Sequence, residues 1–124
     1  MNEMTWKGVI IEESLEDKSL LDLVKIKDTK KERLEGENRV MTLHKVEVSD
    51  KNKDDFVQKA IKSIKQSFYI HLVKNKVMYV IFKNIMYKFS KGYPELEEAR
   101  EHGKKIGIKE EQMPFEYLLE EPWD

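Results

Sequence analysis

The chain has 124 residues, of which 38% are charged and 40% hydrophobic, with a formal net charge of −1 and no cysteine. The absence of cysteine excludes disulfide bonds, thiol catalysis and thiolate metal ligands, and it fits a reducing, cytoplasmic compartment. The length predicts one domain over residues 1–124, and apolar runs such as Met78–Phe82 are far shorter than the roughly 20 residues of a membrane-spanning helix.

Charge is segregated along the chain. From Asp50 to Gly92 there are ten lysines against three aspartates, and from Tyr93 to Asp124 four basic residues against ten acidic ones. Summed fields of this kind act over the roughly 8 to 10 Å that physiological salt leaves unscreened. The pattern therefore favours contact between these two parts of one molecule, or contact with a partner.

The first part of the chain predicts three strands. Residues 6–13 are β-branched at their centre and form the first strand, and Ser14–Lys18 is a turn or a capped helical turn. Alternation from Leu20 predicts a second strand whose far half, near Lys30, is an exposed polar ribbon. A turn at Gly36–Asn38 then leads to a third strand, which closes an antiparallel pair.

The third strand, over residues 39–48, changes its hydrophobic phase. Met41 and Leu43 share one parity, whereas Val46 and Val48 share the other, which is typical of a β-bulge. His44 lies at this change of phase. Because bulges often redirect side chains beside active sites, His44 becomes a candidate site residue.

The middle of the chain predicts a helix and a meander. The helix begins near Asp50 and places one apolar stripe in the core: Phe56, Val57, Ala60, Ile61 and Ile64. Residues 67–73, 76–82 and 85–90 follow as three short strands joined by hairpins. In the first of them Phe68, Ile70 and Leu72 point to one face, and Tyr69, His71 and Val73 to the other.

The last third predicts two helices. Pro94 begins the first, which is acidic on its outer side, and Gly107 ends it. Its apolar stripe is Leu96, Ala99, Gly103 and Ile106. We expect this stripe to fold back over the chain's own sheet; the alternative is a second subunit, with Phe115 and Trp123 as exposed anchors of a homodimer and Leu96 in the contact surface.

The assembled prediction is an α+β fold with the order βββαβββαα. A mostly antiparallel sheet of about six strands carries helices packed on it. The order of the strands within the sheet is left open.

Three histidines raise the question of a site. His44, His71 and His102 lack the short spacings of zinc sites, so we predict no metal and no cofactor, although His44, His71 and one carboxylate would form a three-ligand site if their strands were neighbours on one face. The alternative is a small-ligand or enzyme site around His44, Tyr69 and His71, with Glu12 as a general base. Ordinary, partly buried histidines are the simplest interpretation.

Lysines alternate with aromatic residues between Phe68 and Tyr93, which is one pattern of single-stranded nucleic acid binding. The same pattern is produced by a buried aromatic face whose solvent side and edges are protected by lysine, and we favour this second interpretation. With only three arginines to form bidentate contacts to phosphate, nucleic acid is an unlikely partner.

No nucleophile elbow and no phosphate-binding glycine loop occurs in the chain. The best prediction from the residues is therefore a non-enzymatic, cytoplasmic module that binds a protein partner or itself through strand edges and the acidic helix. Ligand binding or enzymatic activity around His44 and His71 is the alternative, and single-stranded nucleic acid binding is the second alternative.

Several strings spread over the chain resemble a family of small prokaryotic proteins of unknown function. They are WKGVIIEESLEDKSLLDLVKI, LHKVEV, YIHLVK, FSKGYPELEEAR and GIKEEQMPFEYLLEEPWD. The resemblance spans nearly the whole length. It implies a self-contained cytoplasmic domain and supplies no activity, cofactor or catalytic residue.

Overall fold

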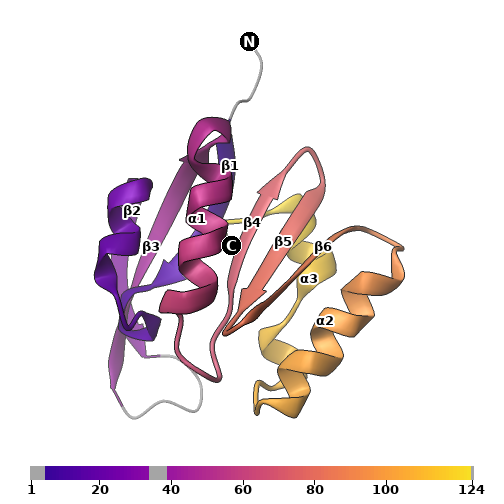
Figure 1. Ribbon diagram of the computed structural model, residues 1–124. Coiled ribbons are helices and arrows are strands. Elements are labelled where there is room, and N and C mark those ends of the chain that lie inside the picture. The colour runs from indigo at the N-terminus through magenta and orange to yellow at the C-terminus, as the bar shows by residue number, and fades with distance from the viewer. Residues whose placement is uncertain (1–4, 34–38, 124) are drawn as a thin grey trace.

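The computed structural model describes residues 5–33 and 39–123 and confirms the α+β class (Figure 1). Its strands are β1 (Thr5–Ile11), β2 (Lys25–Arg33), β3 (Val40–Ser49), β4 (Ile70–Lys74), β5 (Val77–Phe82) and β6 (Ile85–Ser90). Its α-helices are α1 (Asp50–Ser63), α2 (Pro94–Lys105) and α3 (Phe115–Glu120), and three 3-10 helices are η1 (Glu12–Ser14), η2 (Lys18–Leu23) and η3 (Glu110–Gln112).

The strands form one antiparallel sheet in the order β2-β3-β1-β4-β5-β6. The first strand of the chain is therefore inserted between two strands that come much later. The β2-β3 hairpin and the β4-β5-β6 meander lie on either side of it, as Figure 1 shows. Both of these local pairings agree with the sequence prediction, whereas the central place of β1 depends on long-range contacts.

Helix α1 covers one face of the sheet. Its predicted start is confirmed, because the Ser49 hydroxyl caps the helix by accepting a hydrogen bond from the Asn52 backbone N–H at 3.2 Å. Figure 1 shows α1 lying across the middle strands. The core beneath it contains Trp6, Ile10, Val46, Val48, Phe56, Ala60, Ile64, Ile70, Leu72 and Ile81, with η2 adding Leu20.

The C-terminal segment packs on the opposite face. Helices α2 and α3 and the turns between them bury a second apolar cluster against β4, β5 and β6. Its members are Val73, Met78, Val80, Phe82, Phe89, Leu96, Ala99, Ile108, Met113, Phe115, Leu118 and Leu119. The expected folding back of the terminal helices over the chain's own sheet is thus confirmed.

Two details of the sequence prediction are wrong. Residues 18–23 form the 3-10 helix η2, which Asp17 caps by accepting from the Ser19 N–H, so β2 begins at Lys25 and not at Leu20. The bulge is in β2 and not at His44, because β3 keeps a continuous register with β1 while the β2 register shifts between Ile26 and Asp28. The phase change in β3 arises because both faces of this strand carry apolar side chains. The turn predicted at residues 36–38 lies outside the described residues.

Gly8 allows β1 and β4 to approach each other closely. A methyl group at this position would overlap the backbone carbonyl oxygen of His71, and backbone atoms in a paired strand cannot move aside as a flexible side chain can. By contrast, the space around Gly92 is open, although its φ of +89° disfavours other residues. Gly8 is therefore required by packing and Gly92 by backbone conformation.

We predict that Gly8→Ala lowers the free energy of unfolding by about 3 kcal/mol, because the methyl group forces β1 and β4 apart. Gly92→Ala, the control, is expected to cost about 1 kcal/mol through backbone strain alone. Urea denaturation followed by circular dichroism measures both values. A Gly8→Ala cost no larger than that of Gly92→Ala would contradict the close approach.

Candidate functional site: a groove on the open face of the sheet

The four residues predicted to form one site lie in two pairs on opposite faces of the sheet. On β1, Ile10 pairs with His44 of β3, and the preceding residue, Val9, pairs with His71 of β4. Consecutive residues of a strand point to opposite faces, so the two histidines cannot share a ligand. Glu12 accompanies His44, and Tyr69 accompanies His71 with ring centroids 6.4 Å apart.

His44 is buried and bonded at both ring nitrogens. Its Nε2 donates to Oε1 of Glu12 at 2.8 Å, and Nδ1 lies 2.8 Å from the Thr29 hydroxyl. The hydrogen bond to His44 is the largest cause of the lowered pKa of the Glu12 carboxyl, and Lys18 adds a weaker attraction at 3.6 Å. These hydrogen bonds connect η1 to β3 and β2. Neither Glu12 nor His44 lines the groove between the sheet and the C-terminal segment.

The second pair lies beside a groove that encloses about 420 Å³, within the roughly 300 to 1,000 Å³ typical of ligand pockets. Its floor is the face of β2, β3 and β1 turned away from α1, and its far wall is the C-terminal segment. The lining residues are Val9, Ile11, Asp28, Lys30, Glu32, Leu43, Lys45, Ser67, Phe68, Tyr69, His71, Ile108, Glu111, Gln112, Pro114, Leu118 and Trp123.

One row of paired residues crosses this floor. Asp28 of β2 is opposite Lys45 of β3, Lys45 is opposite Val9 of β1, and Val9 is opposite His71 of β4. Neighbouring strands are roughly 4.8 Å apart, so the backbones of Lys45 and His71 are about 10 Å apart. The groove therefore has a charged end, an apolar middle and an imidazole at its inner end.

His71 is held in one tautomer. Its Nε2 lies 2.6 Å from the carbonyl oxygen of Pro122, and a carbonyl can only accept, so Nε2 carries the proton. Burial lowers the pKa of His71, which keeps the ring neutral and makes Nδ1 an acceptor. Burial also raises the pKa of Tyr69, whose hydroxyl donates to the Gln112 carbonyl at 2.6 Å.

The last residues complete the inner end of the groove. The indole N–H of Trp123 donates to the Val46 carbonyl at 3.2 Å, and the Lys7 ammonium lies 5.0 Å from the centroid of the Trp123 ring. Together with the bond from His71 to Pro122, these contacts hold the chain end against β1, β3 and β4. The groove wall is therefore fixed by contacts to its own floor.

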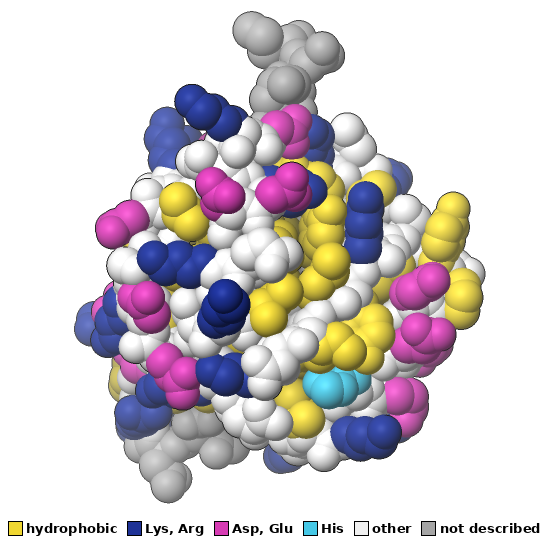
Figure 2. Space-filling view, viewed as in Figure 1, with side chains coloured by type: hydrophobic (Ala, Val, Ile, Leu, Met, Phe, Trp, Pro, Cys, Tyr) yellow, Lys and Arg dark blue, Asp and Glu magenta, His cyan; other side chains and the backbone are white. Residues whose placement is uncertain are grey.

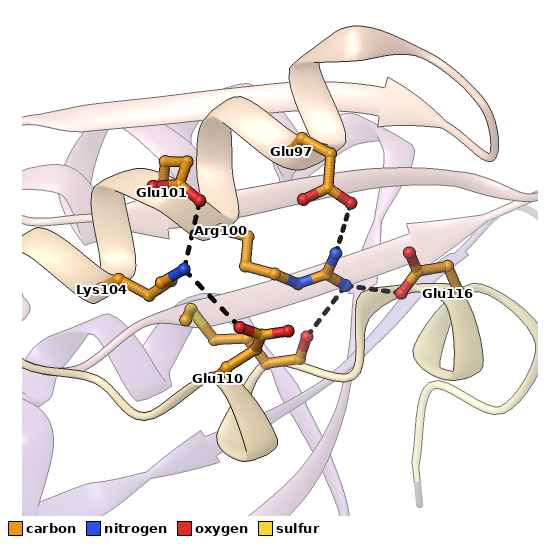
Figure 3. A network of polar contacts seen from close by, with 7 residues as sticks. Glu97, Arg100, Glu101, Lys104, Glu110 and Glu116 are labelled. Carbon is orange, nitrogen blue, oxygen red and sulfur yellow. Dashed lines mark hydrogen bonds and ion pairs between the residues drawn. The ribbon is translucent and has the colours of Figure 1, made fainter.

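A network of ion pairs holds α2 to the segment that forms this wall (Figure 3). Arg100 of α2 donates to Glu97 at 2.6 Å, to the Met113 carbonyl at 3.3 Å and to Glu116 at the start of α3. Nearby, Lys104 contacts Glu101 at 3.3 Å and Glu110 of η3 at 3.6 Å. Arg100 lies just beside the apolar stripe of α2, so the sequence pattern alone gives no signal of this network.

The residues predicted for a contact surface are mostly internal. Leu96 is 3% exposed and Phe115 is fully buried, so neither is available to a partner, and Trp123 lines the groove. Three of the rings suggested as a platform for nucleic acid bases are internal: Tyr79, Phe82 and Phe89 are 6%, 0% and 2% exposed, whereas Phe68, Tyr69 and Tyr87 are half-buried. Bases cannot stack on the three buried rings.

Lys45 and Val9 were not singled out from the sequence, because their importance depends on which strands are neighbours.

Within residues 5–33 and 39–123, no three histidine, aspartate or glutamate side chains are placed to hold a metal ion. The helices in the same ranges are all too short or too polar to cross a membrane. The cytoplasmic location stays a prediction.

Comparisons with protein-family models, with curated proteins and with solved structures found no match to this chain. The resemblance to a prokaryotic family therefore also stays a prediction. Any functional proposal depends on the groove and on the surface of the chain itself.

We predict that Arg100→Met lowers the free energy of unfolding by about 1 to 2 kcal/mol at neutral pH, because Glu97 and Glu116 lose their charged partner, while the Met113 carbonyl keeps its hydrogen bond from the Phe115 N–H at 2.9 Å. The hydrogen bond from Arg100 is the largest cause of the lowered pKa of Glu116. A carboxyl group whose pKa is lowered in the folded state stabilises the fold at pH values above its ordinary pKa. This stabilisation is lost as the pH falls through the folded-state pKa.

The difference between wild type and Arg100→Met should therefore shrink as the pH is lowered from about 6 to about 3. Lys104→Met, which removes exposed ion pairs, is the control and should cost about 0.5 kcal/mol or less. Urea denaturation over this pH range measures both variants. A difference that stays constant with pH would exclude the coupling between Arg100 and Glu116.

Proposed function

We propose that this protein binds a small, largely apolar ligand in the groove between the open face of β2, β3 and β1 and the C-terminal segment. The groove itself is the observation that carries the proposal. Both cores are closed, yet beside them Val9, Ile11 and Leu43 remain only half-buried on the floor of a concave space. Apolar floors with a few polar groups at one end are typical of ligand sites.

The polar groups of the groove favour binding over catalysis. The Tyr69 hydroxyl and His71 Nε2 both donate to backbone carbonyls that position the C-terminal segment. A general acid must give its proton to a substrate, and both of these protons are already donated within the chain. We therefore assign them the role of shaping the groove.

Ligand binding is thereby favoured over the partner-binding module predicted from the sequence. The partner-binding module was motivated in part by the apolar stripe on α2, whose Leu96, Ala99 and Gly103 are buried within the chain, as expected from the sequence. The ligand-binding alternative keeps two of its four residues, Tyr69 and His71. Glu12 and His44 are left out because they lie on the other face.

We predict that the neutral probe 2-naphthalenemethanol binds in the groove. In methyl-labelled protein, NMR titration should shift the methyl signals of Ile11, Leu43 and Leu118, whereas the core methyl groups of Ile10 and Ile70 should not move. Core side chains have no free space next to them and serve as an internal control.

Leu43→Trp should weaken this binding at least about tenfold, because the larger ring fills the groove. Ile26→Trp is the matched control, since Ile26 is 43% exposed on β2 and does not line the groove. A cooperative thermal unfolding transition in each variant is the check that both variants fold. Shifts confined to other parts of the molecule, or equal binding by both variants, would refute the proposal.

Self-association is a second candidate, because the two edges of the sheet differ. Strand β2 carries several exposed lysines and a register shift, and both features discourage pairing with another strand. At the other edge, β6 begins with Ile85 and Met86, each 37% exposed, and Tyr93 beyond it is 60% exposed. Figure 2 shows hydrophobic side chains reaching the surface between α1 and α2.

We infer that a second copy of this chain pairs with β6, antiparallel, about a twofold axis. Met86→Lys should then convert the dimer to a monomer in light scattering at increasing protein concentration, because a lysine at this edge disfavours strand pairing. The matched control is Ile26→Lys on the β2 edge, which should leave the mass unchanged. A wild-type protein that stays monomeric at every concentration would end this proposal.

A further inference from the structure

The two ends of the groove differ in chemistry, and this difference specifies a ligand. Resting on the proposed function, we infer that the groove binds a planar aromatic carboxylate, with its carboxylate at Lys45 and a hydrogen-bond donor at Nδ1 of His71.

Lys45 supplies the positive charge. Its side chain is half-buried in the lining of the groove, and its ammonium has no ion pair within the described part of the chain. Among the other charges of the groove, Lys30 pairs with Glu32 at 3.1 Å. Asp28, the cross-strand neighbour of Lys45, accepts from the Thr29 N–H at 2.9 Å, and Glu111 lies in the far wall. An ammonium beside an apolar floor favours an anionic group on a ligand that is otherwise apolar.

His71 supplies the acceptor at the other end. Its Nε2 donates to Pro122, and no hydrogen bond to Nδ1 occurs among the described residues. Within the same residues, Oε1 of Glu95 is the one fully buried side-chain nitrogen or oxygen atom that lacks a hydrogen-bond partner. Nδ1 is therefore not sealed in the core, and His71 lines the groove, so a donor on a ligand can reach this nitrogen.

The surface between the two groups suits a flat ring. The row from Lys45 to His71 passes over Val9 and spans about 10 Å of backbone, with Leu43 and Ile11 beside it. Phe68, Tyr69 and Trp123 add aromatic side chains to the lining. A bicyclic aromatic ring with polar groups at opposite ends matches this arrangement in shape and in polarity.

The test compares three probes that share one ring system, measured by isothermal titration and by the methyl shifts described above. The probes are 2-naphthalenemethanol, which is neutral, 2-naphthoate, which is anionic, and 6-hydroxy-2-naphthoate, which adds a donor at the far end. We expect 2-naphthoate to bind about tenfold more tightly than the alcohol, and the hydroxynaphthoate about threefold more tightly still.

Two variants assign these gains to residues. Lys45→Met should remove the tenfold preference for 2-naphthoate and leave the affinity for the alcohol unchanged, whereas Lys30→Met, the matched control in the same groove, should keep the preference. His71→Phe should remove the gain from the hydroxyl group and keep the preference for the anion. Affinity for the alcohol shows in each case that the groove is intact.

The outcomes separate this inference from the proposed function. If none of the probes shifts the groove methyl groups, the proposed function fails. If the alcohol and 2-naphthoate bind equally well, or Lys45→Met and Lys30→Met behave alike, the groove binds ligands but the inferred carboxylate is wrong. If only the hydroxyl gain is missing, the assignment of His71 as the second contact is overturned.

Discussion

The structure depends on one constraint, which is that β4 and β5 must be covered on both faces. The residues from Ile70 to Val73 and from Met78 to Phe82 are all buried, and alternate side chains of both strands enter opposite cores. Helix α1 covers one face, and the C-terminal segment covers the other. The described part of that segment extends over only part of the sheet, and the same face of β1, β3 and β2 carries the groove. The groove is the boundary between the covered and the uncovered part.

Apolar burial, and not charge, brings the last third of the chain onto the sheet. The segment from Asp50 to Gly92 is positive and the remainder is negative, yet a single ion pair joins them among the described residues, between Lys76 and Glu120 at 3.3 Å. Other acids of the C-terminal segment pair within it, as Glu97 and Glu116 do with Arg100. Exposed ion pairs contribute roughly 0 to 1 kcal/mol each, whereas a fully buried Leu or Phe side chain contributes about 1.5 to 3 kcal/mol. The buried leucines and Phe115 of this segment therefore contribute more to its attachment than its ion pairs do.

The features of this fold that the sequence predicts are local, and those that it does not predict depend on long-range contacts. Alternation along residues 68–73 is local, and it correctly assigned Ile70 and Leu72 to one face and Tyr69 and His71 to the other. The insertion of β1 between β3 and β4 is not local, and no pattern within a strand encodes it. That insertion alone decides that His44 and His71 face opposite sides, which is why a site containing both could be suggested but not tested from the sequence. The position of Lys45 in the groove could not be predicted for the same reason, because it depends on the pairing of Lys45 with Asp28 of β2 and Val9 of β1.

If the groove binds a ligand as proposed, this binding is thermodynamically coupled to the docking of Pro122 and Trp123. His71 both lines the groove and donates to Pro122, and Trp123 both lines the groove and donates to the Val46 carbonyl. A ligand that contacts these side chains binds the docked form more tightly than a form whose end is detached, so it must stabilise the docked form by mass action. The reverse also holds by linkage, because contacts that hold Pro122 and Trp123 in place raise the affinity of the groove. The short terminal segment thus does two things at once: it closes the second core with Phe115 and Leu118, and it gives the open face of β1 a wall against which a ligand can be bound.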